Sequence, residues 1–244
     1  MKPHSVEILD PESGLFVSLT NGGSGAVMIG SDVIAAAPIP ETGLDGLSDG
    51  PLTLETERGS LELSIESQGE PIEFDGDHTG RREARLARMS GSLVDRGETI
   101  ALDCSGVLHF RSGEAQPAAL ERDLTIILAD GGLICLAAAR PQGVDRHSDE
   151  ETIAAISHPG GYVGFDEVLL STEYDGSGRQ RRATLELWPA SEEIAVLHGA
   201  GSVITGCTAK VGTARINTAL FRWSLDGHLG MGRYEITQRI GTSS

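Results

Sequence analysis

The sequence predicts an all-β protein made of two β halves packed together. Apolar and polar residues alternate along most of the chain, which is the pattern of strands with one buried face. The 32 glycines supply many tight turns between these stretches. Helical periodicity is nearly absent. At 244 residues the chain is long enough for one large β domain or two smaller ones.

Two hairpins stand out. Residues 52–57 and 60–66 both alternate between apolar and polar side chains, which predicts a strand pair with one buried face. Residues 120–128 and 133–139 flank Asp130-Gly131, a dipeptide typical of hairpin turns. Similar stretches lie at residues 84–93, 99–110, 183–187 and 218–225. Together these patterns predict about 14 to 18 short strands.

Residues 148–157 are the exception to the β pattern. Asp149, Glu150 and Glu151 suit the first turn of a short helix, because negative charge is favourable at a helix N-terminus. The same segment also fits a loop.

A weak internal repeat indicates the division into halves. Asp75-Gly76 and Asp175-Gly176 each precede an arginine-rich, alternating stretch, at an offset of 175 − 75 = 100 residues. A duplication would explain the repeat, with halves at residues 1–145 and 146–244. The alternatives are that Asp-Gly turns recur by chance, and that the chain forms one large sandwich.

Charge and composition exclude several classes of function. The chain has 19 basic and 36 acidic residues, so its formal net charge is −17. That charge repels phosphate and anionic lipid, so no nucleic-acid partner is expected. No apolar run is long enough to cross a membrane, and the first residues lack the apolar core of a signal peptide. We therefore expect no membrane insertion and a cytoplasmic location.

Cysteine and histidine usage argues against covalent and metal frameworks. The chain has an odd number of cysteines, three, and none forms a Cys-x-x-Cys pair, so a disulfide framework or zinc site is not expected. None of the seven histidines forms His-x-His or His-Glu-x-x-His. We expect no metal. The oligomeric state, a homodimer included, stays open.

The C-terminal segment is the most distinctive. Residues 219–225 alternate and place Trp223 on one face. Gly230 and Gly232 leave one face of the next strand bare, so Trp223 or a ligand is expected to lie against that backbone. By parity, Glu235 falls on the opposite face from the two glycines.

This ending, Asp226-Gly227-x-x-Gly230-x-Gly232-x-x-Glu235, resembles that of the tandem lipocalin-like β proteins related to hydroxyneurosporene synthase (carotenoid 1,2-hydratase) and the AttH-type proteins. The turn Asp175-Gly176-x-Gly178 is similar to one in the same group. The resemblance implies two lipocalin-like barrels that bind or convert apolar compounds. It also implies hydratase or cyclase chemistry on isoprenoids or polyketides that uses acidic residues and pocket shape, without a cofactor.

Such chemistry needs a proton donor in a dry pocket. A carboxyl group buried among apolar side chains keeps its proton near neutral pH. We predict Glu235 as the catalytic acid, with Asp166, beside a glycine-rich aromatic loop, as second choice. The structural alternative is that Glu235 pairs with Arg222 or Arg233. The predicted ligand-binding residues are aromatic: Trp223, Phe221, Tyr162, Phe165, Tyr174 and Tyr234.

The favoured function is binding, and acid-catalysed hydration, cyclisation or isomerisation, of a small apolar isoprenoid-, steroid- or polyketide-like compound. A lyase or isomerase of this kind is our first hypothesis. The second is a non-catalytic carrier for a hydrophobic ligand, and the third is a β scaffold with no pocket. The sequence does not separate the first two, because they share the pocket and differ by one or two polar residues.

Overall fold

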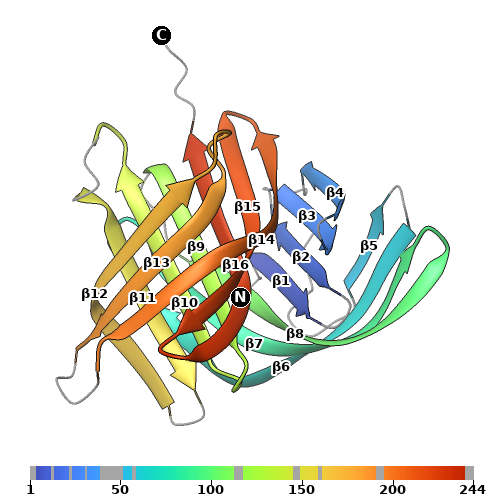
Figure 1. Ribbon diagram of the computed structural model, residues 1–244, viewed down its shortest axis with the longest axis horizontal. Helices are drawn as coiled ribbons and strands as arrows, with labels where there is room; N and C mark the ends of the chain where they lie inside the picture. The colour runs from blue at the N-terminus through green and yellow to red at the C-terminus, as the bar shows by residue number, and fades with distance from the viewer. Residues whose placement is uncertain are drawn as a thin grey trace. The chain divides into compact units, whose positions relative to one another are not determined.

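The computed structural model describes residues 4–11, 14–21, 24–30, 32–38, 52–56, 59–112, 118–144, 149–158, 161–190 and 195–239. Over this part of the chain the protein is almost entirely β, with sixteen strands and no α-helix (Figure 1). The all-β prediction is confirmed. No helix among the described residues is long and apolar enough to cross a membrane.

The short helix considered for residues 148–157 does not form. Residues Glu151–His158 are strand β11, paired antiparallel with β10 (Leu133–Pro141). The acidic residues satisfied a local helix rule, but seven cross-strand pairs to β10 decide the conformation.

The chain divides into two units. The first, the sheet unit, contains Met1–Pro71 and Glu83–Arg111. The second, the barrel unit, contains Ile72–Arg82 and Ser112–Ser244. This division differs from the boundary expected near residue 145. The physical reason is that β9 (Ala118–Leu128) pairs with both β10 and β16 (His228–Arg239), so it is needed to close the barrel.

The sheet unit is an eight-stranded sheet in the order β4-β3-β2-β1-β8-β7-β6-β5. Alternate side chains form its core, which includes Ile8, Leu61 and Leu108. Its strands are β1 Ser5–Asp10, β2 Leu15–Thr20, β3 Ser24–Ile29, β4 Asp32–Pro38, β5 Leu52–Thr56, β6 Gly59–Phe74, β7 Arg81–Asp95 and β8 Glu98–Ser112.

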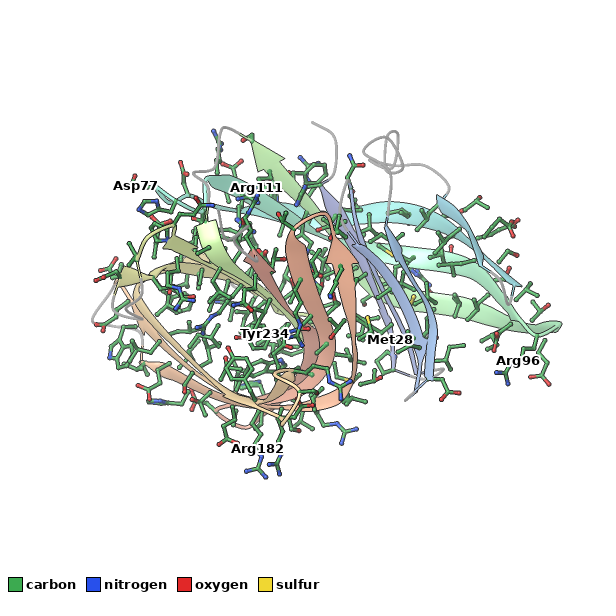
Figure 2. The ribbon with its side chains drawn as sticks, turned by 90° about the horizontal axis from the view of Figure 1, so that it is seen from above. Met28, Asp77, Arg96, Arg111, Arg182 and Tyr234 are labelled. Carbon is green, nitrogen blue, oxygen red and sulfur yellow. The ribbon has the colours of Figure 1, made fainter. Side chains whose placement is uncertain are left out.

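The barrel unit is a closed eight-stranded barrel in which every strand pairs with its neighbours in sequence and β9 pairs with β16. It also includes the end of the β6–β7 hairpin. Figure 2 shows Tyr234 inside the barrel and Arg182 on its outside. The remaining strands are β12 Gly161–Tyr174, β13 Gln180–Pro189, β14 Leu197–Val211 and β15 Ala214–Leu225.

The two halves share a strand order, since β1 pairs with β8 as β9 pairs with β16. This agrees with two lipocalin-like halves, one of them an open, curled sheet. The two Asp-Gly turns do not correspond, however. Asp75 follows the sixth strand of the first set, whereas Asp175 follows the fourth strand of the second set. The offset of 100 residues is therefore not a trace of the shared strand order, and the matched turns expected from it are wrong.

An aromatic cluster fills the barrel core. Phe221 stacks on Trp223 with ring centroids 5.7 Å apart and meets Tyr234 edge-on at 5.6 Å. All three side chains are buried. The glycine beneath the indole ring is Gly201 of β14, where an added Cβ would lie 2.8 Å from ring atoms.

Gly230 and Gly232 serve a different purpose from the one predicted. Added Cβ atoms there would meet β9, at Ile126 and at the carbonyl of Thr125 respectively. The bare face of β16 therefore allows β9 to approach and close the barrel, and Trp223 is the cross-strand partner of Gly230 on β15.

Candidate ligand-binding site in the barrel

The larger cavity lies where two barrel strands separate. Strands β11 and β12 pair only from Ala155↔Gly164 to His158↔Gly161, and a bulge follows between Phe165 and Glu167. Beyond the bulge, β12 pairs with β13 alone. A cavity of about 530 Å³ is present beside this part of β12. It is lined by Arg122, Ala138, Glu150, Thr152, Val168, Leu169, Leu170, Ser171, Thr172 and Tyr174.

A charged pair lies in this cavity. Arg122 occupies an inward position of β9, on the same face as Leu124 and Ile126. Its Nε atom is 3.0 Å from Oε1 of Glu150, and both side chains are less than one-tenth exposed. The Nη1 group also donates to the carbonyl of Leu170 at 3.4 Å. The pair thus brings charge into a wall that otherwise combines apolar residues, such as Val168 and Leu170, with hydroxyl-bearing ones, such as Ser171 and Thr172.

Tyr234 adds a buried hydroxyl next to this pair. Its Oη atom is 2.6 Å from Oγ1 of Thr172, a lining residue of the cavity. Burial raises the pKa of Tyr234 to about 12, although the nearby Arg122 and Thr172 act in the opposite direction. The phenol therefore keeps its proton at neutral pH. Gln180 fixes the backbone of this residue by donating to the Tyr234 carbonyl at 3.1 Å.

These groups form an amphipathic site. Arg122 and the Thr172 hydroxyl supply hydrogen-bonding groups, with Tyr234 buried behind Thr172, and Glu150 supplies a carboxylate. Val168 and Leu170 supply apolar surface. Such a cavity suits a molecule with an apolar body and one polar oxygen, because a few placed polar groups orient a ligand that is otherwise held by apolar contact. Among the described residues, no three His, Cys, Asp or Glu side chains gather as a metal site would require.

The predicted aromatic residues are distributed over three regions. Phe221, Trp223 and Tyr234 meet in the barrel core, and Tyr174 lines the cavity at its exposed rim. Phe165 lines a second cavity, described below. Tyr162 is exposed, and its hydroxyl donates to the carbonyl of Glu73 at 2.7 Å.

The two predicted acids lie outside the larger cavity. Glu235 is buried on the outward face of β16, 3.2 Å from Arg233 Nη1, and accepts from the Thr218 hydroxyl at 2.7 Å. This contact is the structural alternative considered for it. Asp166 is exposed at the β12 bulge. The catalytic roles of both residues stay predictions.

Sequence reasoning missed Arg122, Glu150 and Thr172. For Arg122 a signal was present, since it is a charged residue at an inward position of the alternating stretch 120–128. Glu150 was assigned to a helix start, so its side chain was not considered for a pocket. Thr172 carries no local signal, because its partner Tyr234 is 62 residues away.

The closed up-and-down barrel with an internal cavity, in tandem with a second eight-stranded sheet, defines a tandem lipocalin-like protein. Two solved structures share this fold. An AttH-like protein from Nitrosomonas europaea superposes with a TM-score of 0.65 at 13% identity, covering 96% of this chain and 90% of that one. Kievitone hydratase from Nectria haematococca superposes with a TM-score of 0.57 at 12% identity, covering 98% and 88%.

The predicted resemblance to AttH-type proteins and hydratases is confirmed for the fold. No protein-family model matches the chain, and no curated protein matches it in sequence. At such low identity the two structures establish the architecture, and function has to be argued from the site.

Proposed function

We propose that the barrel unit binds a small, largely apolar molecule in the larger cavity and converts it by hydration, cyclisation or isomerisation without a cofactor. The observation that carries this proposal is that the Arg122–Glu150 pair and Thr172, whose hydroxyl is bonded to the buried Tyr234 behind it, line one cavity together with Val168 and Leu170. The fold of kievitone hydratase, a hydratase by name, supports the same class of reaction.

The ligand's polar oxygen is expected at Arg122 and Thr172, which both line the cavity. Both groups donate hydrogen bonds, and burial strengthens such bonds because the local dielectric is low. The apolar body then lies along Val168 and Leu170 of β12. Thr172 accepts from or donates to the Tyr234 hydroxyl and so sets its direction.

The weak acidity of Tyr234 limits which reactions and substrates fit this site. A phenol whose pKa is about 12 is too weak an acid to protonate an isolated alkene. Through its bond to the Thr172 hydroxyl it helps to stabilise negative charge that develops on a carbonyl oxygen, and Arg122 adds to this effect. The favoured substrate is therefore an apolar compound whose double bond is conjugated to a carbonyl group.

Glu150 completes the proton transfers. In hydration, its carboxylate accepts a proton from water as the water oxygen bonds to the β-carbon. The double bond becomes an enolate held by Arg122 and the Thr172 hydroxyl. The enolate then collapses as Glu150 returns the proton to the α-carbon, so one water molecule is added in total.

The decisive experiment compares two carboxylates. Conjugated enones that bind the protein are incubated with it, and mass spectrometry detects the gain of one water or a shifted double bond. Glu150→Gln should lower turnover roughly 100-fold to 10,000-fold while leaving binding nearly unchanged. Glu235→Gln, the same change on the outward face, should leave turnover per folded molecule intact.

The opposite pattern would assign catalysis to Glu235, as predicted from sequence. A carrier remains the second candidate, because a carboxylate held by an arginine also serves as a fixed structural pair. Saturable binding without conversion of any bound enone, in the wild type as in both variants, would establish the carrier.

A further inference from the structure

A second cavity lies at the other end of the barrel. Its volume is about 200 Å³. On β9, Leu128 of this cavity is six residues from Arg122 of the larger one, or about 20 Å along the strand. The buried side chains of Leu124 and Ile126 lie between them on the same face. The full lining is Leu128, Asp130, Ile134, Ile156, His158, Val163, Phe165, Leu197, Leu225 and His228.

This cavity is apolar inside and polar at its mouth. Leu128, Ile134 and Leu225 are buried. By contrast, the side chains of Asp130 and His228 are 50% and 64% exposed. A ligand would therefore enter with its apolar part first and leave a polar group near the mouth.

We propose that this cavity is a second binding site, for a neutral molecule of single-ring size that carries a hydroxyl group. An apolar protein cavity of roughly 150 Å³ lined by Leu, Ile and Phe binds benzene. The cavity here is somewhat larger and has the same kinds of lining residue, so it fits one ring with a small substituent. The site is separate from the cavity of the proposed function and does not depend on it.

The preference for a hydroxyl group comes from His228. Its Nδ1 atom is 3.3 Å from Oδ2 of Asp130, whose other oxygen accepts from the Gly132 N–H at 3.1 Å. A histidine that donates through Nδ1–H to a carboxylate presents Nε2 as an acceptor in its neutral form. Nε2 then accepts from a ligand O–H, whereas an anionic ligand is repelled by Asp130.

The test uses p-cresol and toluene, which differ only in the hydroxyl group. Both are titrated into the full-length protein with ¹³C-labelled methyl groups, observed by NMR. We expect saturable shifts at Leu128, Ile134 and Leu225 with both compounds. The dissociation constant for p-cresol should be roughly threefold to tenfold lower than for toluene, as one hydrogen bond provides.

Substitutions locate the site and identify the donor. Val163→Trp and Leu197→Trp each fill the cavity and should abolish the shifts, and either one that folds is sufficient. Val33→Trp, on an exposed position of β4, is the matched control and should leave them unchanged. His228→Ala should remove the preference for p-cresol without weakening toluene.

Thr172→Trp, which fills the larger cavity, should leave binding of both probes intact. The proposal is overturned if no saturable shifts appear, if they appear only around Leu170, or if Thr172→Trp abolishes them. It is also overturned if His228→Ala weakens both probes equally. These binding results do not depend on whether Glu150 catalyses a reaction in the larger cavity.

Discussion

Glu150 and Glu151 are consecutive in sequence, yet their carboxylates bind different parts of the barrel unit. Glu150 pairs with Arg122 in the larger cavity. Glu151 accepts from three consecutive backbone N–H groups, of Asp77, His78 and Thr79, at 2.6 to 2.8 Å. Since neighbouring side chains of a strand point to opposite faces, the start of β11 connects the cavity to the β6–β7 hairpin.

The Glu151 contact predicts a pH-dependent stability. Burial alone would raise the pKa of Glu151, but the three backbone donors outweigh it and lower the pKa below its usual range. A lowered folded-state pKa stabilises the protein above the unfolded value of about 4.3 and loses this effect as pH falls through the folded value. Glu151→Ala should therefore cost about 1 kcal/mol at neutral pH, after allowance for solvent screening.

Denaturant unfolding at neutral pH and near pH 3 measures this difference, which should shrink at the lower pH. Glu167→Ala, at an exposed position of β12, is the control. An equal loss at both pH values would mean that the carboxylate charge contributes nothing.

Replacing glycine by alanine is expected to affect stability differently in the two Asp-Gly turns. A Cβ at Gly76 would collide with the Thr79 hydroxyl and lie 2.8 Å from the Glu151 carboxylate, whereas a Cβ at Gly176 would meet nothing within 4 Å. Gly76→Ala should destabilise the protein by about 1–3 kcal/mol, since it displaces the carboxylate from its donors. Gly176→Ala should be nearly neutral in the same thermal unfolding experiment. Equal effects would show that Glu151 moves aside freely.

Trp223 is expected to be a main support of the barrel core. Its ring is buried, stacks on Phe221 and covers Gly201. Trp223→Ala should lower the free energy of unfolding by about 3–5 kcal/mol, because it removes a large side chain and leaves a void. Chemical denaturation measures the loss, with Tyr162→Ala as the exposed aromatic control. Almost no change in the free energy of unfolding would mean that neighbouring side chains move in and fill the void.

Glu235→Gln is expected to lower the free energy of unfolding. The change removes the charge that compensates Arg233, and both side chains are less than one-tenth exposed. Leaving a buried guanidinium without its carboxylate should cost about 1–3 kcal/mol. Glu173→Gln, on an exposed position of β12, should cost almost nothing. Unchanged stability together with lost turnover would instead support the catalytic role predicted from sequence.

Several features followed from the sequence because they depend on local pattern. Alternation placed Trp223 and Phe221 on one face of β15, and parity placed Glu235 on the opposite face of β16 from Gly232. The glycines of β16 were recognised as a bare surface. The sequence did not show that β9 packs against this surface, because the contacting residues of β9 and β16 are more than 100 positions apart in the chain.

The sequence by itself determined the all-β class and the facing of individual side chains, since these depend on a period of two residues and on turn chemistry. The tandem lipocalin-like architecture followed from the resemblance carried by the C-terminal motif. Tertiary structure decided where the units divide, that residues 151–158 form a strand, and that Arg122, Glu150 and Thr172 line one cavity, with Tyr234 bonded to Thr172. The physical reason is that barrel closure pairs distant strands, and only this pairing brings the inward Arg122 close to the carboxylate of Glu150 and the phenol of Tyr234.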